Sequence, residues 1–446
     1  MRHPLHQPHP RIFKPRLKRN IGLFEATLYG IGIILGAGIY VLIGQGAGIA
    51  GNALWLSFVV SAIVAAFTAL SYAELSGMFP REAAEYVYMQ SAFKRNSLAF
   101  FVSWIALAAG ILCAATVSLG FAGYFIKFFP GFFLPAALGL IAVLSVVNFI
   151  GMKESARFNT VLTLIELCGL LIIIAIGLPF LGKVNYFETP GNAVNLADFL
   201  QPVAGAAALI FFAYIGFEDL ANVSEETRNP KRTIPIAMLL SLAISTVLYI
   251  LVSISAVSVL GWQQLSQSTA PIASVAQKAF GPDAFTLLAL IALCSTANTV
   301  LIALISVSRR IFGMSEEKCL PAFLRRIHSR TGTPYAAVVL TMVFAMAFAL
   351  MGDIKSVASL SNLGIFLIFF AVNCCVIALR YAKPNAKRTF KTPLSIGRFP
   401  ILPLFGAITC LAMLLQFPPV LMGFALIAFA ASLPIYYILN KLKLNK

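Results

Sequence analysis

Charged side chains are scarce in this sequence, and acidic ones are the scarcest. Of its 446 residues only 16 are Asp or Glu and 33 are Lys or Arg, so charged residues make up 11% of the chain and hydrophobic ones 60%. This balance, with a mean hydropathy of +0.90, lies far outside the composition of water-soluble globular proteins. The sequence is therefore that of a polytopic membrane protein.

Cysteine and histidine are also few, and neither has the spacing of a metal site. The seven cysteines include no Cys-x-x-Cys pair. His3, His6 and His9 lie in a proline-rich stretch far from His328, so they predict no metal centre. The sequence also contains no set of nucleophile and base and no phosphate-binding loop. We therefore expect neither an enzyme nor a bound cofactor.

The alternating strands of an outer-membrane barrel are absent too, and the apolar runs are about twice as long as such strands need. Windows long enough for a bilayer instead predict an all-α fold of twelve transmembrane helices. These helices are expected at 22–47, 52–78, 98–126, 131–151, 157–181, 202–222, 234–260, 284–308, 335–352, 357–380, 399–416 and 419–439.

The net charge of +17 does not indicate nucleic-acid binding, because of where the charges fall. If the N-terminus is cytoplasmic, 29 of the 33 Lys and Arg residues lie on the inner side. The four on the outer side are Lys127, Lys183, Lys278 and Lys355. This asymmetry predicts a plasma-membrane protein with cytoplasmic N- and C-termini. Basic clusters at the inner helix ends, such as 383–391, are placed to touch anionic lipid.

The first predicted helix is interrupted by glycine. Gly30, Gly32, Gly36 and Gly38 fall within the run GIGIILGAGIY. Glycine lowers the cost of leaving helical geometry, and an opened turn inside a membrane must line a cavity or meet a ligand, because each unpaired backbone group costs several kcal/mol there. Close helix packing through small residues is the alternative explanation.

The sixth predicted helix is also interrupted at a glycine. It is apolar through FFAYIG and becomes acidic at Glu218 and Asp219. The first and sixth helices stand at corresponding places in two groups of five. Such a pattern indicates a transporter built of two inverted repeats with its site between them. The expected domains are a cytoplasmic tail at 1–20, a first repeat at 21–182, a second repeat at 200–381 and a final helix pair at 398–440.

One acid, Glu166, lies well inside the fifth predicted helix, where a carboxylate costs at least about 2.5 kcal/mol. With Glu218 and Asp219 it is one of the three acids that we place inside spans away from their ends, and no Lys or Arg is expected there to pair with them. Burial without a positive partner disfavours the charged form, so such an acid can take up and release a proton. The alternative for Glu166 is a protonated acid that is hydrogen-bonded to a neighbouring helix.

The eighth predicted helix carries polar side chains on an apolar background. Ser295 and Thr299 share one face at four-residue spacing. Hydroxyls of this kind usually bond to their own helix, and they gain importance only if the fifth helix faces them. We expect Glu166 to be the coupling group beside Ser295 and Thr299, with the proton as the coupling ion and sodium less favoured.

Taken together, four motifs resemble those of the amino acid, polyamine and organocation (APC) superfamily. They are Gly-Ala-Gly-Ile-Tyr at 36–40, Ser-Tyr-Ala-Glu-Leu at 71–75 followed by Phe-Pro, Phe-Phe-Ala-Tyr-Ile-Gly-Phe-Glu at 211–218, and Leu-Pro at 320–321. The resemblance implies the leucine-transporter fold, a 5+5 inverted repeat with broken first and sixth helices. It also implies a secondary active transporter of amino acids.

In that superfamily the broken helices bind the substrate through their backbones. We expect the first and sixth helices to be unwound at Gly36 to Gly38 and at Ala213 to Gly216, where they face each other. Carried over by motif, the resemblance implies amide donors for the substrate carboxylate at Gly36, Ala37 and Gly38. It implies carbonyl acceptors for the ammonium group at Ile33, Phe212, Ala213 and Ile215, next to Gly216, with Tyr214 and Phe217 as gates or walls. A helix N-terminus attracts anions and a helix C-terminus attracts cations, which suits a zwitterion.

Departures from the superfamily pattern leave alternatives open. Glu166 stands where cationic amino acid transporters often have a lysine, and Glu218 resembles an acid of arginine and polyamine exchangers. Exchange of cationic amino acids or polyamines is thus one alternative, and a membrane-embedded amino acid sensor without flux is another. Many members pair with a glycoprotein through an outer cysteine. Because none of the seven cysteines falls on an expected outer loop, we predict no disulfide-linked partner subunit.

Overall fold

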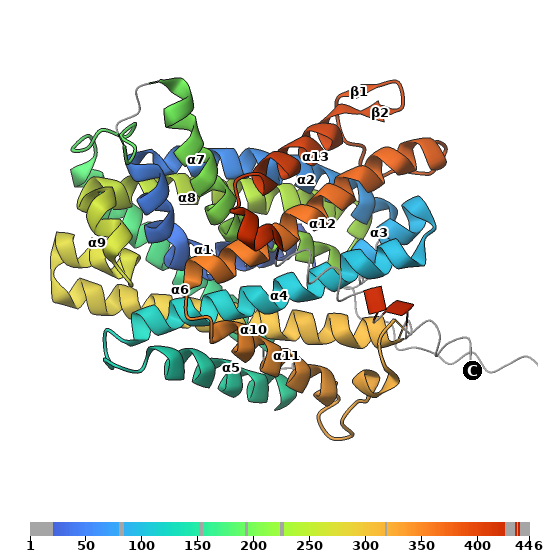
Figure 1. Ribbon diagram of the computed structural model, residues 1–446, viewed down its shortest axis with the longest axis horizontal. Helices are drawn as coiled ribbons and strands as arrows, with labels where there is room; N and C mark the ends of the chain where they lie inside the picture. Colours follow the sequence, from blue (N-terminus) through green and yellow to red (C-terminus); the bar gives the residue numbers. More distant parts are fainter. Residues whose placement is uncertain are drawn as a thin grey trace, which may run out of the picture.

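The computed structural model describes residues 21–79, 84–150, 155–191, 195–223, 227–316, 319–423, 433–434 and 436–437. This part of the chain is almost entirely helical. The long helices run side by side along the long axis of the molecule (Figure 1). Such an arrangement is expected because an apolar chain in a membrane must pair its backbone groups internally.

The first half of the chain forms six α-helices joined by short connections. They are α1 (Leu23–Ala50), α2 (Leu54–Met78), α3 (Ala84–Phe93), α4 (Asn96–Phe125), α5 (Phe133–Ile150) and α6 (Ser155–Gly177), with the 3₁₀ helices η1 (Gly51–Ala53) and η2 (Leu178–Phe180).

The second half adds further helices and a small hairpin. The helices are α7 (Leu196–Ile210), η3 (Phe211–Tyr214), η4 (Phe217–Val223), α8 (Pro230–Gln267), α9 (Pro271–Phe280), α10 (Pro282–Glu316), η5 (Ala322–Arg325), α11 (Tyr335–Ala349), α12 (Ile354–Ala382) and α13 (Ile401–Leu414). The strands β1 (Ser395–Ile396) and β2 (Phe399–Pro400) pair antiparallel, with Ser395 opposite Pro400 and Ile396 opposite Phe399.

Eight stretches of the described chain are long and apolar enough to cross a membrane. They are Leu23–Met78, Asn96–Phe125, Phe133–Ile150, Val161–Phe180, Leu196–Ala221, Pro230–Gln267, Pro282–Glu316 and Ile354–Ala382. The first stretch contains both α1 and α2, and α11 and α13 are shorter apolar helices that coincide with two further predicted spans. The predicted tail at 1–20 and most of the predicted span at 419–439 lie outside the described residues.

Two helices extend well past the predicted spans. The eighth span was expected at 284–308, but α10 continues to Glu316 and so contains Arg309 and Arg310. The seventh was expected at 234–260, but α8 runs to Gln267 through a kink at Gly261, whose φ is +72°. A hydropathy window ends where polar residues begin, whereas helical hydrogen bonding continues beyond them.

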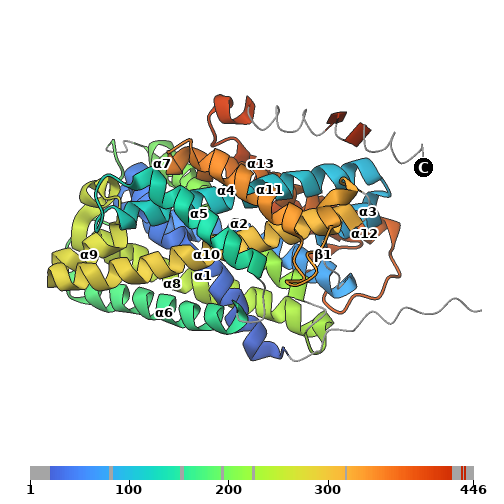
Figure 2. The ribbon, with the colours of Figure 1, turned by 90° about the horizontal axis from the view of Figure 1, so that it is seen from below.

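Helix α1 forms the centre of the bundle. Apolar residues occupy all of its sides, and residues 34–44 are buried without exception. It packs chiefly on α8, with α7, α10 and α6 completing its surroundings, and Figure 2 shows it running beside α8 and α10. A helix that is apolar all round is expected to be enclosed by other helices. The glycine-interrupted segment therefore lies in the interior.

Candidate functional site

The interruption in α1 is narrower than predicted. The sequence predicted an opening over Gly36, Ala37 and Gly38, but in the structure Gly36 alone departs from helical dihedral angles, with φ 0° and ψ −168°. The helix resumes at the next residue. The Ala37 amide then donates to Oγ1 of Thr299 on α10 at 3.0 Å. A side chain from another helix thus partners an amide at the start of the second half of α1, as expected for orphan donors at a helix N-terminus.

The second interruption follows α7 and has a different form. The chain passes from α7 into η3, becomes extended at Ile215 (φ −62°, ψ 136°), and turns at Gly216, where φ is +122°. It then enters η4. The Ile215 amide donates to the Phe212 carbonyl oxygen at 3.3 Å. The sequence placed the opening at Ala213 to Gly216, whereas 3₁₀ geometry already begins at Phe211.

The two interruptions touch backbone to backbone. A Cβ atom added to Gly38 would lie 2.5 Å from Cα and 2.9 Å from Cβ of Ala213. One added to Gly216 would lie 3.3 Å from the carbonyl oxygen of Ile33. Glycine is therefore required at both crossing points, because any side chain would push the two segments apart. The structure thus brings together residues that the sequence predicted on two distant helices.

Tyr249 of α8 joins the two interruptions, and the sequence analysis missed it. Its hydroxyl lies 2.5 Å from the carbonyl oxygen of Ile34 and 2.9 Å from that of Ala213. A hydroxyl has one proton to donate, so it can satisfy only one of these acceptors at a time. The other carbonyl can then accept from a ligand. The available signal was the single aromatic residue of the predicted span 234–260, since a buried tyrosine hydroxyl usually finds a partner.

Asn362 of α12 supports the end of α7. Its side-chain amide donates to the carbonyl oxygens of Ala208 at 2.8 Å and Leu209 at 2.7 Å. These carbonyls belong to the last turn of α7, where the change to 3₁₀ geometry alters the helical pairing. Asn362 thereby fixes where α7 ends, and this role had no signal in the sequence beyond a polar residue in an apolar helix.

Glu166 of α6 meets α10 where the sequence analysis predicted. Its side chain is 1% exposed, and its Oε1 accepts from the Ser295 hydroxyl at 2.5 Å. Thr299, one turn further along α10, donates to the Ser295 carbonyl oxygen at 3.1 Å and accepts from the Ala37 amide. A short chain of polar groups thus connects the carboxylate to the interruption of α1. Oε2 of Glu166 has no hydrogen-bond partner among the described residues.

Two tyrosines fix the surroundings of Glu166. The Tyr40 hydroxyl donates to the Glu166 carbonyl oxygen at 3.0 Å, and the Tyr124 hydroxyl donates to the Tyr40 carbonyl oxygen at 2.8 Å. Close contact of α6 with α1 depends on Gly32, because a Cβ there would lie 2.5 Å from Oγ1 of Thr163. The carboxylate is therefore held in a pre-organised position between α1 and α10.

Asp219, which follows the second interruption, has a positive partner, and this corrects one expectation. The sequence placed no Lys or Arg within a span to pair with Glu166, Glu218 or Asp219. In the structure Nη2 of Arg310 lies 3.1 Å from Oδ1 of Asp219 and 4.0 Å from Oε1 of Glu85. The expectation was wrong because α10 continues past its predicted end and so includes Arg310.

Glu218 itself folds back on the interruption. It is 5% exposed, and its Oε2 accepts from the Gly216 amide at 2.9 Å. Tyr214 instead points to α2, where its hydroxyl donates to the Phe58 carbonyl oxygen at 3.0 Å. Its ring contacts those of Phe58 and Tyr249. The structure thus gives Tyr214 packing contacts on the side of α2 and α8.

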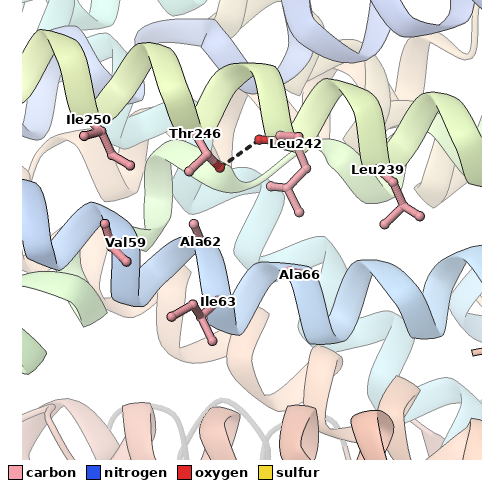
Figure 3. A pocket seen from close by; sticks show the side chains of 9 residues that line it. Val59, Ala62, Ile63, Ala66, Leu239, Leu242, Thr246 and Ile250 are labelled. Atoms are coloured by element: carbon pink, nitrogen blue, oxygen red, sulfur yellow. Dashed lines mark hydrogen bonds between the residues drawn. The ribbon is translucent and has the colours of Figure 1, made fainter. Parts of the chain in front are cut away.

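A separate apolar cavity lies between α2 and α8 (Figure 3). Its lining includes Ile63, Leu239 and Ile250, and Thr246 in the same wall donates its hydroxyl proton to the Leu242 carbonyl oxygen at 2.8 Å. None of the predicted site residues lines it. In the described part of the chain, no group of three or more His, Cys, Asp or Glu side chains could hold a metal ion.

Comparison with known proteins finds similarity to permeases and transporters. A model of the family described as amino acid permease matches residues 21–439. The branched-chain amino acid permease BcaP and the methylthioribose transporter of Bacillus subtilis (strain 168) are each 30% identical, with 95% of this chain and 94% of each relative covered. Cationic amino acid transporter 4 of Homo sapiens is 29% identical, with 83% of this chain and 61% of the relative covered.

Proposed function

Because this chain belongs to the amino acid permease family of the APC superfamily, and is thus a multi-pass membrane transporter and not an enzyme, we propose that it is a proton-coupled secondary transporter of amino acids in the plasma membrane. Family membership implies a leucine-transporter-like fold. Within that fold we assign helices 1–5 to residues 21–182 and helices 6–10 to residues 200–381, as inverted repeats. The pair at 398–440 completes twelve helices, with both termini cytoplasmic.

The observation that carries this proposal is the backbone contact between the two interruptions. Gly38 packs on Ala213, and Gly216 packs on Ile33. In the proposed site, amides from Gly36 to Gly38 bind the substrate carboxylate, and the Ala37 amide exchanges its Thr299 acceptor for the substrate. The ammonium group binds carbonyl oxygens of Ile33, Phe212, Ala213 and Ile215. Backbone groups suit this task, because they recognise the part that all amino acids share and leave the side chain free to differ.

The proposed coupling group is Glu166. Its Oε2 is buried without a partner among the described residues, and its Oε1 connects through Ser295 and Thr299 to the Ala37 amide. Protonation of Glu166 changes the charge at one end of this series of hydrogen-bonded groups, and movement of α1 changes the hydrogen bond at its other end. A bound proton and a bound substrate can thus both affect the position of α1, which is the requirement for coupling. Sodium is the less favoured ion.

Substrate class separates the first proposal from its alternative, an exchanger of cationic amino acids or polyamines. Similarity to a branched-chain amino acid permease favours leucine, isoleucine and valine. The acidic Glu218 beside the interruption favours a cationic side chain. These two hypotheses make different predictions for one substitution.

Glu218→Gln is expected to weaken uptake of lysine and arginine about fivefold relative to leucine if Glu218 binds the cationic side chain, because a hydrogen bond to a charged group is worth roughly 1 kcal/mol more than a neutral one. The glutamine oxygen can still accept from the Gly216 amide, so the turn is preserved. Initial uptake rates of the three amino acids measure the effect. An equal loss for all three would assign Glu218 to support of the turn and remove the cationic alternative.

Counterflow into proteoliposomes tests the transport proposal against a sensor. Vesicles loaded with an unlabelled amino acid should accumulate the same labelled amino acid transiently, since a carrier exchanges substrate in both directions. A panel that includes leucine, arginine, methylthioribose and putrescine covers the substrate classes raised above. Binding to the purified protein with no counterflow for any bound compound would identify a sensor.

A further inference from the structure

The connection between α12 and α13 presents apolar side chains to the outside of the protein. In this segment, residues 383–398, here called the basic hairpin, Leu394 is 64% exposed and Ile396 is 74% exposed. Leu394 also has a φ of +55°, a conformation that strains the backbone of a bulky residue. The strands β1 and β2 lie at one end of the molecule, beyond the start of α13 (Figure 1). Apolar side chains held outward in this way indicate an interaction surface.

The surroundings of this apolar pair are uniformly basic. The basic hairpin contains Lys383, Lys387, Arg388, Lys391 and Arg398. It contains no Asp or Glu, and no acidic residue follows Asp353 anywhere in the sequence. Lys387, Lys391 and Arg398 are exposed, and in the described part of the chain none of the three forms a salt bridge. The surface is therefore complementary to a negatively charged partner.

A buried acid of α2 holds the root of the basic hairpin. The Glu74 carboxylate, 1% exposed, accepts from Nε and Nη2 of Arg380 at 2.7 and 2.6 Å and from Nε of Arg388 at 3.0 Å. It also accepts from the amide and hydroxyl of Thr392 at 2.9 and 2.8 Å. Bidentate pairing of this kind fixes geometry as well as charge. The apolar tip thus projects from a root tied to the ends of α2 and α12.

We propose that the basic hairpin is a membrane-docking surface that binds anionic phospholipid head groups and inserts Leu394 and Ile396 among their acyl chains. Two predicted spans flank it, so the bilayer surface is adjacent, and aliphatic side chains surrounded by Lys and Arg are the pattern that binds such a surface. The proposed orientation of the chain serves only to name the leaflet, which is the inner one. Because Glu74 belongs to α2, anionic lipid would also hold the ends of α2 and α12 at that surface.

Tryptophan quenching tests the docking. Full-length Ile396→Trp protein is reconstituted in phosphatidylcholine vesicles with brominated acyl chains, with or without roughly 30% of the anionic lipid phosphatidylglycerol. The wild type, with its three tryptophans, supplies the background. We expect the introduced tryptophan to be quenched at least about twofold more with the anionic lipid, and the excess to vanish at 1 M salt, where the Debye length is about 3 Å.

Matched charge variants in the Ile396→Trp background separate a specific surface from general basicity. The triple variant Lys387→Gln, Lys391→Gln, Arg398→Gln should lose the excess quenching. The triple variant Arg325→Gln, Arg326→Gln, Arg330→Gln, which removes three exposed charges after α10, should keep it. Equal quenching in the two lipids, or equal loss in the two triple variants, would overturn the proposal. This readout involves no transport, so its failure is distinct from failure of the proposed function.

Discussion

Gly38→Leu is expected to reduce amino acid uptake below about 1% of the wild-type rate, because a loss of about 3 kcal/mol in substrate binding is more than a hundredfold. Even a Cβ at this position would lie 2.5 Å from Cα of Ala213. The leucine side chain would fill the place proposed for the substrate carboxylate and separate the two interruptions. Initial uptake of the best counterflow substrate into proteoliposomes measures the effect.

Two further variants serve as comparisons for Gly38→Leu. Gly139→Leu adds the same side chain to α5, where a Cβ would have no neighbour within 4 Å, and it should transport normally. Gly38→Ala adds the Cβ alone and should give an intermediate rate. Unchanged melting temperature and elution volume of Gly38→Leu in detergent show that it is folded. Normal uptake by a folded Gly38→Leu protein would place the substrate site elsewhere.

Glu166→Gln is expected to abolish accumulation driven by a pH gradient while sparing exchange between internal and external substrate. A gradient of one pH unit is worth about 1.4 kcal/mol and supports about tenfold accumulation for one proton per substrate. In the variant the accumulation ratio should fall to about one. The glutamine oxygen can still accept from Ser295, so the contact between α6 and α10 is retained while the titratable proton is lost.

The control for this substitution is Glu316→Gln, which neutralises an exposed acid at the end of α10 and should leave accumulation unchanged. Both variants are compared with an imposed inward proton gradient, with a sodium gradient and with neither. Full proton-driven accumulation by Glu166→Gln would make Glu166 a structural residue. A requirement for sodium in the wild type would instead make Glu166 a cation ligand.

The parts of the fold that the sequence predicted depend on local chemistry. Apolar runs of bilayer length can be recognised in the sequence without knowledge of tertiary contacts, and every predicted span up to 399–416 coincides with a helix. Glycine marked the interruptions at Gly36 and Gly216, because few other residues tolerate such backbone geometry. The meeting of Glu166 with Ser295 was also foreseen, since buried polar groups in apolar helices must find partners.

The contacts that the sequence analysis missed depend on which helices pack against each other in the fold. Tyr249 bridges two carbonyls that lie 215 and 36 residues away in sequence, and nothing local to α8 specifies that contact. Arg310 pairs with Asp219 because α10 continues as a helix past the end of its apolar stretch. The opening of α1 is limited to Gly36, and the Ala37 amide that follows it finds its partner in Thr299 of α10. Glycine content alone could not reveal this contact.

The central claim is that the interrupted helices bind the charged backbone of an amino acid, and competition in the counterflow assay tests it most directly. The competitors are the transported amino acid, its methyl ester, its N-acetyl derivative and the amine left by decarboxylation. Each derivative loses one charged group that the site is proposed to bind, so each should compete at least about tenfold less well than the parent. Equal competition by the amine would show that no carboxylate is bound at Gly36 to Gly38, and would contradict the account.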